Sequence, residues 1–130
     1  MAFLPYCSMT PKIRVDDRKR LRRRVDGWAR RIKAVPRVVR IQRMARKWGS
    51  CSSGGIITLA DDLTRRAPGF QDFVIAHELL HLRIPNHGKL FKSLMGAYVP
   101  RWRNYDLQRS AAARRTPRLR RSGANSAKHS

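Results

Sequence analysis

Residues 71–83 read QDFVIAHELLHLR, and this stretch decides the fold because it is apolar on nearly every side. A helix of this composition is buried inside a domain instead of lying on its surface. Pro68-Gly69 precedes the stretch and Pro85 follows it, so we expect one helix over residues 71–83. The remaining elements must therefore pack around this helix.

Three side chains that can bind a metal or activate a metal-bound water lie within this predicted helix: His77, Glu78 and His81. At ~100° per residue, His77 and His81 fall on one helix face, where two imidazoles can reach one tetrahedral cation. Glu78 is offset from that face and can accept a proton from a metal-bound water, which generates a hydroxide that attacks a carbonyl. The pattern predicts one catalytic Zn²⁺ per chain, with Glu78 as the base.

A catalytic zinc site needs a third protein ligand, and His87 is the first candidate because the chain can turn back after the break at residues 84–86. The alternative is a downstream carboxylate, for which Asp106 is the only acidic side chain after His81. Cys51 is the candidate for a fourth ligand, which would close the site and make it structural. Burying these polar groups without a partner would be costly, which also favours a bound metal.

Elements on both sides of this helix are predicted from periodicity and turn residues. Apolar residues recur at three- and four-residue steps between Asp16 and Lys33, which indicates an amphipathic helix. The turn sequence SSGG at residues 52–55, between runs rich in β-branched residues, predicts a small antiparallel sheet. We expect strands over residues 37–44, 46–52 and 56–59, and two further helices over residues 87–98 and 100–108.

A length of 130 residues suffices for one compact domain. We expect a flexible N-terminal arm over residues 1–15, one domain over residues 16–109 and a disordered basic tail over residues 110–130. No apolar run approaches the ~20 residues that span a bilayer, and the two cysteines are too few for a disulfide framework. These features predict a soluble, cytoplasmic protein.

The chain is strongly basic, with 30 Lys and Arg against 8 Asp and Glu and a formal net charge of +22. The excess lies outside residues 51–100, where basic and acidic side chains nearly balance. Such flanks could contact DNA or RNA without sequence specificity, or could simply be solvated. A second hypothesis is therefore a basic nucleic-acid-binding module with a structural zinc site.

Several motifs resemble one family in both sequence and order. RKWGSCS at residues 46–52 precedes the apolar strand at 56–59, and HELLHLRIPNHGKLF follows at residues 77–91. Over about residues 26–107 this order resembles the YgjP-like metallopeptidases and their SprT-like and Wss1-like relatives. The resemblance implies an α+β, minimal zincin-like domain in which a small antiparallel sheet packs on the active-site helix. It also implies zinc-assisted hydrolysis of a polypeptide substrate, with ligands His77, His81 and His87 and the base Glu78.

Further residues outside the predicted metal site bear on substrate binding, on oxyanion stabilisation and on the class of zinc peptidase. Residues 48–52 could form an edge strand along which an extended peptide lies, although Trp48 could equally be a core residue. Tyr98, Tyr105 or a basic side chain could stabilise an oxyanion. Metzincins carry glycine where this chain has Ile84, which argues against that clan.

Overall fold

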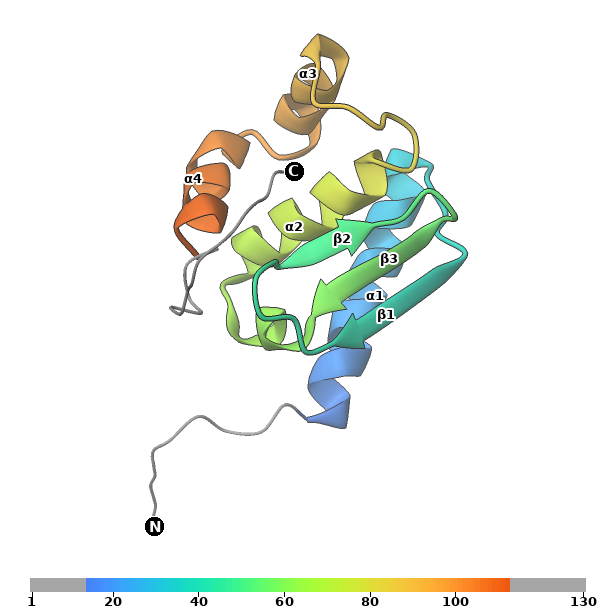
Figure 1. Cartoon of the computed structure of the whole chain (residues 1–130), viewed down its shortest axis with the longest axis vertical. Helices are drawn as coiled ribbons and strands as arrows, with labels where there is room; N and C mark the ends of the chain where they lie inside the picture. The colour runs from blue at the N-terminus through green and yellow to red at the C-terminus, as the bar shows by residue number, and fades with distance from the viewer. Residues whose placement is uncertain (1–13, 113–130) are drawn as a thin grey trace, which may run out of the picture.

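The computed structural model describes residues 14–112, and side chains as far as Arg109. These residues form an α+β domain (Figure 1), as predicted. The elements are α1 (Val15–Ile32), β1 (Val38–Gln42), β2 (Gly49–Cys51), β3 (Ile56–Ala60), the 3-10 helix η2 (Asp61–Arg65), α2 (Pro68–Leu80), α3 (Lys89–Tyr98) and α4 (Trp102–Ala112). The predicted arm and tail lie almost entirely outside the described residues. No helix within residues 14–112 is long and apolar enough to cross a membrane.

The sheet is mixed, whereas the sequence predicted an antiparallel one. Its strand order is β1-β3-β2, and β2 pairs with β3 antiparallel, as expected from the turn at residues 52–55. β1 pairs with β3 in parallel, with Val38 opposite Ile56 and Gln42 opposite Ala60. The reason is the path of residues 43–48, which carry the chain to the far edge before the hairpin returns β3 into the centre. Two reversals of direction then make β3 parallel to β1.

Two arginines of α1 occupy the outer edge of β1. Arg22 donates from NH1 to the carbonyl of Val39 at 2.7 Å, and Arg18 donates from NH1 to the carbonyl of Ile41 at 3.2 Å. These carbonyls would otherwise offer a second strand a place to pair. The α1 arginines therefore cover one edge of the sheet, and β2 forms the other edge.

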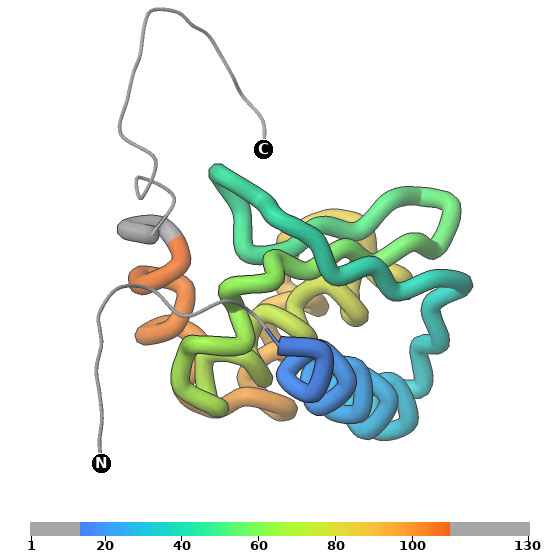
Figure 2. Tube along the Cα trace, turned by 90° about the horizontal axis from the view of Figure 1, so that it is seen from below, coloured from blue at the N-terminus to red at the C-terminus, as the bar shows by residue number. Residues whose placement is uncertain are grey.

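Helices α1 and α2 pack against each other on one face of the sheet (Figure 2). The apolar stripe of α1 is buried, and its members are Leu21, Val25, Trp28, Ala29 and Ile32. Across the interface, Asp72 of α2 accepts from the Trp28 indole at 2.8 Å and from Arg24 at 2.7 Å, both at Oδ1. One carboxylate thus fixes the register of the two helices.

Helix α2 begins and ends earlier than the predicted 71–83. Pro68 occupies the first turn, where its missing N–H costs no intrahelical bond, so the expected break is instead the helix start. At the other end, the amides of Leu82 and Arg83 donate to the carbonyls three residues back, at 3.0 Å each. The last turn is therefore tightened, and His81 becomes the capping residue of α2.

Replacing Asp72 with alanine should destabilise the domain. Trp28 is 7% exposed, so its indole N–H would lose its acceptor in a buried interface, at a cost of about 1–3 kcal/mol. Asp72→Asn keeps an oxygen for Trp28 and should cost less. Thermal or urea denaturation of both variants measures this difference, and equal losses would contradict the role of the Trp28 bond.

Candidate metal centre and cleft

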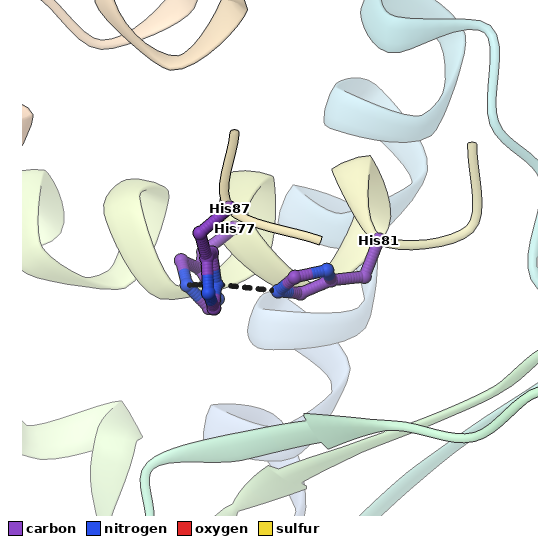
Figure 3. A group of neighbouring side chains, drawn as sticks. All are labelled: His77, His81 and His87. Atoms are coloured by element: carbon purple, nitrogen blue, oxygen red, sulfur yellow. Dashed lines mark hydrogen bonds between the residues drawn. The ribbon is translucent and has the colours of Figure 1, made fainter. Parts of the chain in front are cut away.

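The three predicted histidines converge at the C-terminal end of α2 (Figure 3). His77 lies in the last turn of α2, His81 caps the helix, and His87 approaches from the loop before α3. His87 Nε2 lies 2.9 Å from His81 Nε2 and 3.2 Å from His77 Nε2. Three nitrogens from two segments therefore meet at one point.

Hydrogen bonds at Nδ1 of His77 and of His81 determine which ring nitrogen faces the point where the three histidines meet. Nδ1 of His81 lies 3.2 Å from the carbonyl oxygen of Ile84, an acceptor, so this nitrogen carries the proton. Nδ1 of His77 lies 3.0 Å from Oε2 of Glu78, and a proton there donates to the carboxylate. Both arrangements leave Nε2 with its lone pair, as metal-binding histidines require.

The spacing of these nitrogens fits a small cation. Tetrahedral zinc with Zn–N bonds of about 2.0–2.1 Å separates its nitrogen ligands by about 3.3 Å. The separations of His87 Nε2 from His81 Nε2 and from His77 Nε2, 2.9 and 3.2 Å, are close to this value, and all three ligand atoms lie within 4.8 Å of one another. The donor set therefore suits Zn²⁺ without rearrangement of the backbone.

Burial and mutual proximity lower the pKa of His81 and of His87 and so favour their neutral forms. Desolvation lowers the pKa of His81, and the neighbouring His77 lowers it further. Desolvation also lowers the pKa of His87, with added contributions from His77, His81 and Arg109. Neutral rings keep the lone pairs that a metal needs.

Phe91 of α3 holds the three rings in place, a role that the sequence analysis missed. Its ring stacks on His81 at a centroid distance of 4.7 Å and meets the edge of His87 at 4.7 Å and of His77 at 5.4 Å. The helical spacing of Phe91 indicated only a core residue, and it is indeed 2% exposed. Its position four residues after His87, on the next helix, was the available signal.

Glu78 packs closely beneath β2 at Gly49, where a larger residue would require its neighbours to shift. A Cβ at Gly49 would lie 3.0 Å from Cγ of Glu78 and 3.2 Å from Cγ1 of Val74. Glu78 is 7% exposed and lines the same cleft as the histidines. The glycine of the Trp-Gly-Ser-Cys motif thus brings the strand directly over the glutamate.

A cleft of about 620 Å³ separates β2 and its flanking residues from the histidines. The carbonyl of Trp48 accepts from Ala60, and the amide of Ser52 donates to Ile56, both at 2.9 Å. Along an antiparallel strand, the backbone N–H and C=O groups of successive residues point to opposite sides. The backbone groups of Gly49 and Cys51 therefore point away from β3. The free edge of β2 therefore borders the cleft.

The rival ligands do not join the histidines. Asp106 pairs with Arg109 at 2.8 Å, and the thiol of Cys51 points to the carbonyl of Ser52 at 3.6 Å. Burial raises the pKa of Cys51, and the charge of Glu78 raises it further, so the thiol is neutral. Within the described part of the chain, the group of metal-ligand atoms contains His77, His81 and His87 alone.

The aromatic candidates are structural. Trp48 is 5% exposed and meets the edge of Phe70 at 5.5 Å, so it belongs to the core. Tyr105 packs on Phe70 and Phe73, and the Tyr98 hydroxyl donates to the carbonyl of Arg31. Neither tyrosine belongs to the cleft lining, which instead contains Arg46, Lys47 and Arg109.

Comparisons with known proteins bear on the fold and on the family of this chain. Two crystal structures share the fold. The metallopeptidase zymogen abylysin of Pyrococcus abyssi has a TM-score of 0.61 and 19% identity, over 68% of this chain and 90% of that one. The zymogen jannalysin of Methanocaldococcus jannaschii has a TM-score of 0.60 and 20% identity, over 68% and 91%.

The sequence itself matches no curated protein. Residues 13–108 match the YgjP-like metallopeptidase domain, and this range contains the three histidines, Glu78 and the whole sheet. Because the match spans most of the chain, the protein belongs to the YgjP-like family of metallopeptidases.

Proposed function

We propose that this metallopeptidase is zinc-dependent, that His77, His81 and His87 bind one Zn²⁺, and that Glu78 is the catalytic base. The convergence of three Nε2 atoms beside a buried carboxylate carries the proposal. The ion would supply Lewis-acid polarisation of a peptide carbonyl and would lower the pKa of a water. Three protein ligands leave a fourth position open, as a catalytic site requires.

Glu78 would move the proton. Its Oε2 accepts from His77 Nδ1, which orients both groups. Its other oxygen, Oε1, would take a proton from the attacking water and deliver it to the leaving amine. Burial under Gly49 holds the carboxylate on the cleft side of α2 while the substrate is in place.

The substrate would be an extended polypeptide that pairs with β2. The outward polar groups of Gly49 and Cys51 offer two donors and two acceptors to such a strand. Arg18 and Arg22 occupy the competing edge at β1. A peptide added to the sheet would therefore lie beside the histidines and not on the opposite side of the domain.

The metal proposal predicts the zinc content of purified variants. Elemental analysis after dialysis should find one zinc per wild-type chain and less than one in His87→Ala, which loses a ligand. Cys51→Ala should retain one zinc, because its thiol lies outside the ligand group. Zinc loss in Cys51→Ala would instead support a closed, structural site and the nucleic-acid-binding module.

The base proposal predicts the activity of Glu78→Gln. This variant keeps the side-chain volume but cannot accept the proton, so casein cleavage should fall by roughly 10²–10⁴-fold. Zinc content should stay at the wild-type level, which separates loss of the base from loss of the metal. Asp26→Asn removes an exposed carboxylate of α1 and is the matched control. Wild-type activity in Glu78→Gln would refute the assignment.

We also propose that the exposed face of α1 contacts DNA or RNA backbones without sequence specificity. Lys19, Arg20 and Arg23 are exposed there in a chain of net charge +22. A cytoplasmic location is part of the same proposal and is supported by the scarcity of cysteine.

Fluorescence anisotropy with single-stranded DNA tests the contact. The logarithm of the binding constant should fall linearly with the logarithm of the salt concentration. The slope of this line should become shallower by about two in the triple variant Lys19→Gln/Arg20→Gln/Arg23→Gln, because each lost phosphate contact removes ~0.7. Oligonucleotides of different sequence should bind alike. An unchanged slope in the triple variant would remove α1 from the binding surface.

A further inference from the structure

The charged side chains that line the cleft are mostly of one sign. Arg46, Lys47 and Arg109 contribute three cations, whereas Glu78 is the single carboxylate in the described lining. Glu78 is 7% exposed and engaged with His77, and Asp106 offsets part of the charge of Arg109, so the charges at the cleft still sum to a positive value.

Arg46 and Lys47 lie at one end of the cleft, and α4 brings Arg109 to the same side of the molecule (Figure 1), within electrostatic reach of His87. Arg46 and Lys47 directly precede β2, whose start is fixed by the contact between Trp48 and Phe70 of α2. Helix α4, which carries Arg109, reaches the same Phe70 through Tyr105 at a centroid distance of 6.3 Å. In Figure 1, α4 and the loop that leads into β2 lie on the same side of the molecule. The opposite end is lined by Ser52, Ser53 and Pro85, which carry no charge.

Arg109 is held in position at this end. Asp106 accepts from Nε at 3.0 Å and from NH2 at 2.8 Å, both at Oδ1. Using one oxygen for two bonds orients the guanidinium plane, and NH1 takes no part in this contact. A cation anchored in this way loses little side-chain freedom when a carboxylate approaches.

The direction of the substrate follows from β2. Antiparallel strand pairs outnumber parallel ones roughly two- to three-fold, and β2 already pairs antiparallel with β3. A peptide antiparallel to β2 runs from the Ser52 end toward the Arg46 end. Residues on the C-terminal side of the scissile bond therefore lie among the cations.

We propose that the cleft selects polypeptides with Asp or Glu within a few residues on the C-terminal side of the cleaved bond, recognised by Arg46, Lys47 and Arg109. The N-terminal side, at the uncharged end, carries no such preference. This inference rests on the proposed peptidase site. It adds a specificity that the metal centre alone does not contain.

Matched fluorogenic peptides test the selectivity on zinc-loaded protein. One peptide carries Gln on both sides of the scissile bond, and two others replace Gln with Glu on one side or the other. Glu on the C-terminal side should raise kcat/KM roughly five- to tenfold, mainly through KM, since each exposed ion pair contributes a factor of only a few. Glu on the N-terminal side should change little. In about 1 M salt the preference should largely disappear.

Variants separate the cleft from the overall charge. Arg46→Gln/Lys47→Gln/Arg109→Gln should abolish the preference, measured as the ratio of kcat/KM between the peptide with C-terminal-side Glu and the all-Gln peptide, because this ratio cancels any change that affects both peptides equally. Arg40→Gln/Lys92→Gln/Arg101→Gln removes the same number of exposed cations outside the cleft lining and should keep the preference. Equal loss in both triple variants would mean that net charge alone attracts acidic peptides, which would overturn the proposal.

Peptide binding measured without cleavage distinguishes the proposed preference for acidic residues from the proposed peptidase activity. Zinc-loaded Glu78→Gln should bind the peptide with C-terminal-side Glu about five- to tenfold tighter than the all-Gln peptide. Cleavage of all peptides at equal rates, with equal affinities, would refute the selectivity and leave the peptidase standing. Selective binding without cleavage by the wild type would refute the peptidase and leave the cationic subsite standing.

Discussion

Burial of ionisable groups on α2 is the constraint on which the rest of the structure depends. His77 and Glu78 are each 7% exposed within a helix whose other buried members are apolar. Isolated there, both side chains would be costly, and the fold meets this cost by pairing them with each other and by bringing His81 and His87 to the same point. The position of α3, the glycine at the start of β2 and the loop at Pro85 all contribute to this arrangement.

The sequence predicted the convergence of the three histidines better than the direction of the strands. Spacing on a single helix fixes the relation of His77 to His81, and the break at Pro85 allows only a short path to His87, so local geometry sufficed. The direction of β1 depends on a non-local event, the insertion of β3 between two earlier strands, and no periodicity in residues 37–44 records it. The start of α2 at Pro68, three residues before the predicted start, has a related cause: a proline can end one helix or occupy the first turn of the next, and the sequence alone does not distinguish these cases.

Residues that act through packing were the hardest to predict. Phe91 and Gly49 carry no ionisable group, and their roles become visible only when α3 and β2 are placed beside α2. Phe91 is 2% exposed, so its burial alone would mark it as an ordinary core residue. Its contact with all three imidazoles couples the docking of α3 to the geometry of the three histidines, so damage to that interface should disturb the candidate site without changing a histidine.

The arginines that cover β1 have a consequence for self-association. A sheet with two open edges can add copies at both sides and grow without limit, as in fibres. In this domain the carbonyls of Val39 and Ile41 are already bonded to Arg22 and Arg18, so growth through β1 would first have to break these bonds. Pairing of two copies through β2 would bury the second open edge and end the assembly at a dimer. Helix α1 thus has two roles: its apolar stripe packs into the core, and its arginines oppose growth of the sheet through β1.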